Sequence, residues 1–371
     1  MERVQQNTYF SRVLDWCEER ESTDLHAQTN EPYCIRVHGE LLRIPVEAFA
    51  APVPGEISQH LRETFSSDAC DRIESRLEVD LSFYFREQRY RANFSKQRGE
   101  QSFSFRIVPQ QEWGLRDLQL PKSLKSIVDH PRGLLLLTGP TGQGKSTTVR
   151  ALLQELNGTS AMRVITIEDP IEYVFTNGMC QFEQREVGID TASFSDGVRN
   201  AMRQDPDVIF IGEMRDRETV RAAMQAAETG HLVLTTLHAD SVAQALGRIR
   251  EFYTSEERDN ISSLLARNLH AIVNQRLIPN RKGTRTPCLE IMKRGPGVQS
   301  AIVKNELQML TGIIEQSVND GMHTFDQYLR ELFAAEIIDE ETALQFAVNR
   351  HRFELVKKGI VTFERILQPL R

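Results

Sequence analysis

The sequence lacks three features that would narrow its class at once. None of its apolar stretches approaches the roughly 18 residues of a membrane span. A formal charge of −7 argues against a broad nucleic-acid surface, so we expect no direct nucleic-acid binding. The five cysteines are scattered and contain no C-x-x-C pair, which indicates neither a disulfide framework nor a tetracysteine zinc site. We interpret them as small buried hydrophobes: Cys17, Cys34, Cys70, Cys180 and Cys288.

Targeting and low-complexity signals are also missing. Residues 1–6 are too polar for a secretory signal, which predicts a cytoplasmic protein. The N-terminal part shows neither a repeat nor a biased tract. With 371 residues, the chain is long for one domain and of a usual length for two domains. A core of that size is stable without disulfide bonds.

The stretch 139–146 reads G-P-T-G-Q-G-K-S, follows the apolar run 134–137, and has the spacing of a phosphate-binding loop. Its glycines allow amide N–H groups to turn toward a phosphate, and the helix predicted from Lys145 adds a partial positive charge. Lys145 is expected to reach the β- and γ-phosphates and Ser146 to ligate Mg²⁺, so we predict ATP and Mg²⁺ as ligands. The predicted nucleotide-binding residues are Gly139, Pro140, Thr141, Gly142, Gln143, Gly144, Lys145, Ser146 and Thr147.

Two later apolar runs, 163–167 and 207–211, each lead to a carboxylate, Glu168 and Glu213. The carboxyl ends of parallel strands form the ligand edge of an α/β sheet, so both acids should lie there. Glu168 is predicted to hold or activate the attacking water, and Glu213 to support Mg²⁺ through water or polarise the nucleophile. Which of the two is the base stays open.

A fourth buried run, 232–237, has a histidine at each end, His231 and His238. We retain both a structural role and a contact with the nucleotide region for these residues. The alternation of strands and helices from the phosphate loop onward predicts an α/β fold with a mostly parallel sheet.

The N-terminal part predicts a small α+β domain. Residues 33–37 and 41–44 flank a hairpin turn at His38-Gly39, and a helix is expected over about 55–64. Period-two alternation then predicts three strands of a half-exposed antiparallel sheet: 81–85, 90–94 and 103–108. A linker should precede a helix at 122–128. The predicted division is 1–112, 113–121 and 122–371.

Those strands carry more arginine than a sheet needs. Solvated edge charge that prevents strand pairing is one explanation. The other is that some of them act as arginine fingers that neutralise charge on a phosphoryl group held by a neighbouring subunit. The residues concerned are Arg89, Arg91, Arg98 and Arg106.

The C-terminal part predicts helices from about residue 256 that pack on the sheet. The prediction rests on apolar residues three and four apart: Ile261, Leu264, Leu265, Leu269, Ile272 and Val273. The basic stretch 350–371 is either a solvated face or a dock for lipid or a membrane protein.

Four motifs in order resemble the secretion ATPases of type II and type IV systems. They are G-P-T-G-Q-G-K-S at 139–146, T-I-E-D-P-I-E-Y at 166–173, I-G-E-M-R-D at 211–216 and T-G-H-L-V-L-T-T-L-H-A-D at 229–240. Further matches at 23–26, 35–40, 80–85, 89–93, 274–279 and 321–326 are most similar to the PilT/PilU-type pilus-retraction ATPases of twitching motility.

The resemblance implies a homo-hexameric ATPase with a PAS-like N-terminal domain and a RecA-like P-loop domain that has C-terminal helices. It assigns Walker A roles to Lys145 and Ser146, the His box to His231 and His238, and finger roles to Arg91 and Arg106. It also implies a position at the inner face of the inner membrane, a membrane-embedded platform protein as partner and a paralogous motor as a second partner.

Two departures bear on the subgroup. The A-I-R-N-L-I-R-E element of the retraction subgroup is replaced here by A-I-V-K-N-E-L at 301–307, which favours an accessory PilU-like motor or a related secretion ATPase. The extra N-terminal domain and tetracysteine insert of assembly motors are not found in this sequence. The alternatives are a secretion or conjugation ATPase, a scaffold that binds nucleotide without hydrolysis, and a RecA-like DNA motor.

Overall fold

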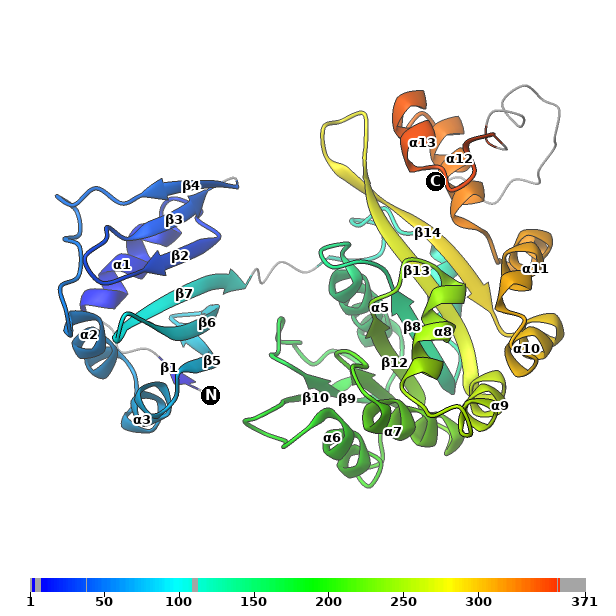
Figure 1. Ribbon diagram of the computed structural model, residues 1–371, viewed down its shortest axis with the longest axis horizontal. Coiled ribbons are helices and arrows are strands. Elements are labelled where there is room, and N and C mark those ends of the chain that lie inside the picture. The colour runs from blue at the N-terminus through cyan, green and yellow to red at the C-terminus, as the bar shows by residue number, and fades with distance from the viewer. Residues whose placement is uncertain (1, 4–7, 38, 109–112, 352, 354–371) are drawn as a thin grey trace. The chain divides into compact units, whose positions relative to one another are not determined.

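A computed structural model describes residues 2–3, 8–37, 39–108, 113–351 and 353 (Figure 1). The chain divides into two compact units, one made of Met1–Gln111 with Pro170–Val174, the other of Glu112–Asp169 with Phe175–Arg371. Each unit is built on its own seven-stranded sheet. His38 of the predicted hairpin turn and most of the basic stretch 350–371 lie outside the described residues.

The N-terminal sheet has the strand order β1-β5-β6-β7-β2-β3-β4, and all neighbours are antiparallel except β1 and β5. The three predicted antiparallel strands are confirmed as β5, β6 and β7, and the predicted hairpin is confirmed as the pair β3 and β4. The elements are β1 (Glu2–Arg3), α1 (Tyr9–Glu18), β2 (Asp24–Ala27), β3 (Cys34–Val37), β4 (Glu40–Arg43), α2 (Glu56–Thr64), α3 (Ser67–Ser75), β5 (Glu78–Phe85), β6 (Gln88–Gln97) and β7 (Glu100–Val108).

Alternation along these strands gives the sheet one apolar face. On β7, Phe103 and Phe105 are buried while Ser104 and Arg106 between and beyond them are exposed. Helices α1, α2 and α3 contribute to the same core cluster as the apolar face, which includes Phe10, Leu61 and Ile73. The helices therefore cover one side of the sheet, and the polar residues share the other side.

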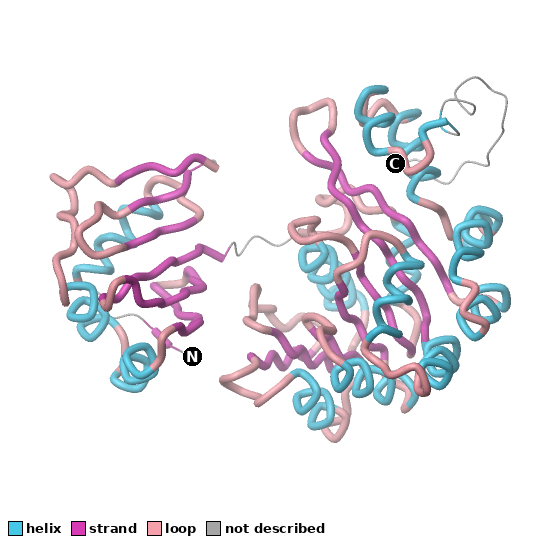
Figure 2. Tube along the Cα trace, in the orientation of Figure 1, coloured by secondary structure: helices cyan, strands magenta, loops and turns pink. Residues whose placement is uncertain are grey.

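The second sheet has the order β10-β9-β11-β12-β8-β13-β14, in which only β14 is antiparallel to its neighbour. Figure 2 shows its strands in magenta with the helices in cyan around them. The predicted α/β class is confirmed. The elements up to the middle of the sheet are the 3₁₀ turn Lys122–Leu124, α4 (Lys125–Val128), β8 (Gly133–Thr138), α5 (Lys145–Thr159), β9 (Arg163–Glu168), β10 (Gln181–Glu186), α6 (Phe194–Ala201), β11 (Val208–Ile211), α7 (Arg217–Glu228) and β12 (Leu232–Leu237).

The remaining elements correct one prediction. The residues Leu269, Ile272 and Val273, expected on a helix, lie on strand β13, which extends the sheet beyond β8. The elements are α8 (Val242–Glu251), α9 (Arg258–Asn268), β13 (Leu269–Pro279), β14 (Arg285–Lys293), α10 (Pro296–Val303), Leu307–Met309 (3₁₀), α11 (Leu310–Gln316), Val318–Asp320 (3₁₀), α12 (Phe325–Ala334) and α13 (Glu340–Phe346).

Helices cover both faces of this second sheet. Leu134 and Leu136 of β8 belong to a core cluster with α6 to α11, whereas α5, which contributes no residue to that cluster, packs on β8 and β12. All six residues of β8 and all six of β12 are consequently buried. Such a sheet presents its ligand-binding groups only at strand ends.

Two smaller expectations can be compared with the fold. Of the cysteines, all free, Cys34 is half-buried, so it departs from the predicted burial, and the other four are buried. In the described part of the chain, none of the helices combines the length and apolarity that a bilayer span requires.

Candidate functional site

The phosphate-binding loop connects β8 to α5, as its motif predicts. Gly144 caps the helix with φ +77°, and Gly139 follows the strand with φ +146°. A Cβ at residue 139 would stand 2.3 Å from the carbonyl oxygen of Gln275, which no side chain could tolerate. The loop therefore needs glycine there both for its backbone angle and for its close approach to β13.

The side chain of Lys145 folds back into the phosphate-binding loop. Its Nζ donates to the carbonyl oxygens of Gly139 at 2.8 Å and Pro140 at 2.9 Å, and the residue is only 7% exposed. Burial lowers the pKa of this ammonium group. Ser146 is exposed in the first turn of α5 and Thr147 is partly exposed, so the loop, the helix terminus and a hydroxyl meet at one place.

Strand β13 supports the loop from behind through a residue to which sequence reasoning gave no role. The buried Gln275 donates from Nε2 to the carbonyl oxygen of Gln143 at 2.8 Å and accepts at Oε1 from Thr148 at 2.7 Å. The amide of Leu277 donates to Oε1 of Gln143 at 2.6 Å. The only signal for Gln275 in the sequence was its place in the family-like stretch 274–279.

Three strand ends are joined by one polar network next to the loop. His238, after β12, lies 3.3 Å through Nε2 from Oε2 of Glu213, after β11, and 3.4 Å through Nδ1 from Oγ1 of Thr141. Glu213 also pairs with Arg215, which lies 3.5 Å from Asp169 after β9. Burial, followed by the positive charge of Lys145, lowers the pKa of His238, so the neutral imidazole is favoured at pH 7.

The chain around Glu213 is fixed by short-range bonds. Thr236 donates from Oγ1 to the carbonyl oxygen of Gly212 at 2.6 Å, and the amide of Met214 donates to the carbonyl oxygen of Thr236 at 3.0 Å. Asp216 then caps α7 by accepting from the amide of Thr219 at 2.8 Å. The residue between these anchors is held at the strand end with little freedom.

Glu168 ends β9, one strand further from the loop in the sheet order. Its Oε1 accepts from Oγ1 of Thr166 at 2.7 Å and from Nε2 of Gln184 at 3.2 Å, and the residue is buried. The two predicted acids therefore share one edge of the sheet, and neutral donors orient Glu168 while His238 and Arg215 face Glu213.

The two predicted histidines lie at opposite edges of the sheet. His231 precedes β12 and bonds through Nδ1 with Oγ1 of Thr229 at 3.1 Å and the carbonyl oxygen of Ala226 at 2.9 Å. Six strand residues separate it from His238, which amounts to roughly 20 Å. Within this unit the structure brings His238 to the phosphate loop and leaves His231 at the far edge.

Of the four candidate finger residues, Arg91 and Arg106 lie together on the face of the N-terminal sheet that points away from its aromatic core. Arg91 and Arg106 are direct cross-strand neighbours on β6 and β7. Nε of Arg106 donates to Oδ1 of Asp24 at 2.8 Å, and its side chain is 69% exposed. Arg89 is 1% exposed and Arg98 lies in the β6–β7 turn with φ +54°. Arg91 and Arg106 thus form a cationic pair on this face.

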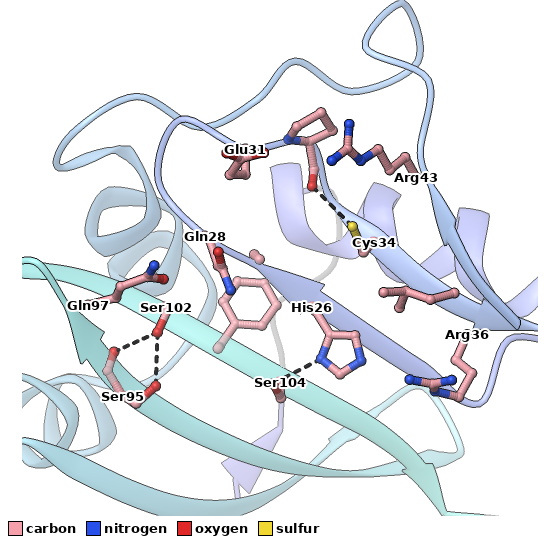
Figure 3. A pocket seen from close by; sticks show the side chains of 14 residues that line it. His26, Gln28, Glu31, Cys34, Arg36, Arg43, Ser95, Gln97, Ser102 and Ser104 are labelled. Atoms are coloured by element: carbon pink, nitrogen blue, oxygen red, sulfur yellow. Dashed lines mark hydrogen bonds between the residues drawn. The ribbon is translucent and has the colours of Figure 1, made fainter. Parts of the chain in front are cut away.

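The same face holds a cavity of about 700 Å³ (Figure 3). Its floor carries a bond of 2.9 Å between Nδ1 of His26 and Oγ of Ser104, and Arg36 and Arg43 line its side. Neither Arg91 nor Arg106 is among its lining residues. The cavity is therefore separate from the predicted finger pair.

A triphosphate fits the residues that surround the loop. The backbone is drawn in so closely at Gly139 that no Cβ could be added, Lys145 provides a buried cation, and Ser146 provides an exposed hydroxyl. These are the donors that phosphate and its Mg²⁺ require at a helix N-terminus. With the parallel sheet, they place the protein in the class of P-loop nucleotide-binding proteins.

Comparison with known proteins narrows the class. Residues 52–330 match the family of Type II/IV secretion system proteins, so the chain belongs to that family. It is 36% identical to the type IV pilus retraction ATPase PilT of Pseudomonas aeruginosa, over 91% of this chain and 98% of that protein. It is 35% identical to the type IV pilus ATPase PilU of the same organism, over 94% and 91% of the two chains.

Solved structures agree with the sequence comparison. The crystal structure of the pilus retraction motor PilT with bound ADP has a TM-score of 0.84 to this chain, at 34% identity, and covers 93% of this chain and 98% of that one. The two-unit fold is therefore that of a PilT-like protein.

Proposed function

We propose that this protein hydrolyses ATP and uses the energy to drive type IV pilus retraction in twitching motility. The observation that carries the proposal is the Thr141–His238–Glu213 network beside a loop that contains Lys145. It is supported by the similarity to PilT and PilU over nearly the whole chain and by the ADP in the PilT crystal structure.

The chain's own groups have separable tasks in this reaction. Amides of the loop bind the phosphates, and Lys145 leaves the carbonyl oxygens of Gly139 and Pro140 to reach the terminal phosphoryl group. Glu168, oriented by Thr166 and Gln184, holds the attacking water, while Glu213 lies against Arg215 and the neutral His238. Either carboxylate can accept the proton of that water.

Ser146 and, through water, Glu213 would hold Mg²⁺, which when bound supplies charge neutralisation between the phosphates. The proposed active unit is a homo-hexamer in which Arg91 and Arg106 reach nucleotide and tie hydrolysis to the state of the ring. Its place is cytoplasmic, at the inner face of the inner membrane. The proposed partners are a membrane-embedded platform protein and a paralogous motor.

A secretion ATPase is the second candidate, because the family that matches residues 52–330 is named for type II and type IV secretion. Deletion of the chain in its host, scored for twitching, surface pilus number and secretion, distinguishes the two. Loss of twitching with intact secretion supports the retraction motor. Loss of secretion alone supports the alternative.

The ATPase assay tests the chemistry directly. Lys145→Ala, Glu213→Gln and Glu168→Gln should each lower turnover by at least about 100-fold, because each removes charge that acts in the transition state. The exposed Glu251→Gln is the matched control and should retain the wild-type rate. Equal rates in the wild type and all variants would contradict hydrolysis and favour a scaffold that only binds nucleotide. Stimulation of turnover by DNA would favour a DNA motor.

Mixing tests the arginine role. Rings that contain Arg91→Ala or Arg106→Ala subunits together with wild-type subunits should lose more activity than the fraction of variant subunits. Loss in simple proportion to that fraction contradicts a role across the subunit interface.

A further inference from the structure

The edge of the second sheet opposite the phosphate loop has a cationic pocket of about 240 Å³. Three arginines from separate segments line it: Arg132 before β8, Arg267 in the last turn of α9, and Arg294 after β14. No residue assigned to nucleotide binding contributes to this pocket. We call it the amino-edge pocket.

The arginines of the amino-edge pocket are poorly neutralised. Glu228 is the acidic residue in the lining, and it lies 3.9 Å from Arg267 with both side chains more than half exposed. Pairs of that kind contribute little. Within the described ranges, neither Arg132 nor Arg294 has an acidic partner within ion-pair distance.

The floor of the pocket is built and rigid. The rings of His130 and His270 stack with centroids 4.0 Å apart, and Nε2 of His270 donates to the carbonyl oxygen of Ile127 at 3.1 Å. A Cβ on Gly133 would lie 3.0 Å from Cβ of His270. The amide of Arg294 donates to the carbonyl oxygen of His270 at 2.9 Å, which fixes the backbone position of Arg294 next to His270.

The lining also contains a neutral ring and an unsatisfied donor. Burial is the main cause that lowers the pKa of His270 to about 4, so its imidazole is neutral at pH 7. In the part of the chain that the structure describes, Nδ2 of the lining residue Asn268 is buried and has no hydrogen-bond acceptor. A phosphate oxygen in the pocket would supply the acceptor that this Asn268 amide lacks.

Neutralisation of the negative helix C-termini explains only part of this clustering of arginines. Helices α7 and α9 both end at this edge, and each C-terminus carries about half a negative charge. Arg267 is placed to offset them, but Arg132 and Arg294 stand outside any helix. Even with Glu228 included, the three guanidinium groups leave a surplus of positive charge.

We propose that the amino-edge pocket binds a phosphate group, with Arg132, Arg267 and Arg294 as its ligands. The planar fork of guanidinium donors matches phosphate oxygens. The volume lies below the roughly 300–1000 Å³ of pockets that enclose whole small molecules, so only the phosphate enters. That phosphate belongs either to a soluble phosphate compound or to the headgroup of an anionic lipid.

The test uses the full chain with Lys145→Ala, and in parallel the wild type saturated with a non-hydrolysable ATP analogue, so that the phosphate loop does not contribute. Equilibrium dialysis with radiolabelled pyrophosphate measures the soluble source. Sedimentation with phosphatidylglycerol vesicles, compared with phosphatidylcholine vesicles, measures the lipid source. Arg132→Ala combined with Arg294→Ala is compared with Arg116→Ala combined with Arg285→Ala, which removes the same charge from exposed positions elsewhere.

The pocket variant should bind at least about tenfold more weakly, because a hydrogen bond to a charged group contributes that much or more. The control pair should bind like its parent. Loss confined to pyrophosphate or confined to vesicles supports the site and assigns the source. Equal binding by both pairs, or no binding by the parent in either assay, overturns the proposal, whatever the outcome of the ATPase assay.

Discussion

The two seven-stranded sheets of this protein differ in how their faces are covered, and the difference decides where chemistry can occur. The N-terminal sheet is covered by helices on one side, so its residues alternate between a core of aromatic rings and an open polar face. The second sheet is covered on both sides, and β8 is buried at every position. An open face can present side chains along its strands, as Arg91 and Arg106 show. A doubly covered sheet presents them only where strands end, as Lys145, Glu213 and His238 do.

The largest effects should come from neighbouring residues on one strand of each sheet. Leu135→Ala and Leu136→Ala on β8 should each cost about 2–5 kcal/mol, because both faces are packed. On β7, Phe105→Ala should cost about 3–5 kcal/mol, while Ser104→Ala, on the open face, should cost less than about 1 kcal/mol. Guanidinium unfolding, followed by Trp16 for the first unit and Trp113 for the second, measures these losses. A large loss of unfolding free energy in Ser104→Ala, or no loss in Leu135→Ala, would contradict the difference between the open and the covered sheet faces.

The next largest effect concerns the backbone at a strand end. Gly139→Ala places a Cβ against the carbonyl oxygen of Gln275, and hydrolysis should fall by at least about 100-fold. Gly283→Ala is the control, since that glycine also has positive φ, at +75°, but nothing lies within 4 Å of its added Cβ. The control should lose about 1 kcal/mol of stability and keep its activity. Substantial turnover by Gly139→Ala would show that the loop is less confined than its geometry indicates.

A buried histidine of the second unit should make stability depend on pH. Burial lowers the pKa of His323 to about 4, so in acid the unfolded chain binds a proton that the folded chain resists. Stability should therefore fall as the pH drops from about 6.5 toward 4, by about 3 kcal/mol from this group between pH 7 and pH 4. His323→Leu should lack that part of the slope in denaturant unfolding across this range.

His26 provides the contrast from the open face. Burial also lowers the pKa of His26, but the residue is half-buried, so His26→Ala should change the slope less. A steeper change from His26→Ala than from His323→Leu would contradict the assignment of open and covered positions.

The smallest effect should come from the ion pair on the open face. Burial would raise the pKa of Asp24, but hydrogen bonds from Arg106 and Thr23 outweigh it and lower the pKa. The stabilisation is thus present above the ordinary pKa of an aspartate and lost as the pH falls further. The Arg106 side chain is 69% exposed and that of Asp24 is 9% exposed, so water screens the pair from one side only. Since asparagine keeps an acceptor for Arg106 and Thr23, Asp24→Asn should cost about 1 kcal/mol at pH 7. Unfolding at pH 7 and pH 3 measures both parts, and a loss above about 2 kcal/mol would mean that water does not screen this pair.

Features of this protein that depend on contiguous residues were predictable from the sequence. The phosphate loop, the strand before it and the helix after it follow one another within the chain, so residue types and spacing were enough. The helix predicted at Leu269, Ile272 and Val273 was wrong, because a strand buried on both faces is apolar at most positions and therefore also satisfies a spacing of three and four. Strand β10 has mostly polar residues and is defined only by its pairing with β9.

By itself, the sequence determined the phosphate-binding motif between a strand and a helix, the α/β class of the second unit and the alternating pattern of the first, since each depends on residues close together in the chain. Only the tertiary structure decided that Gln275 supports the loop from 132 residues away, that His238 lies beside Glu213 while His231 lies at the opposite edge, and that three arginines surround one pocket. The physical reason is that strand order and register determine which distant residues become neighbours, and local residue patterns do not encode strand order.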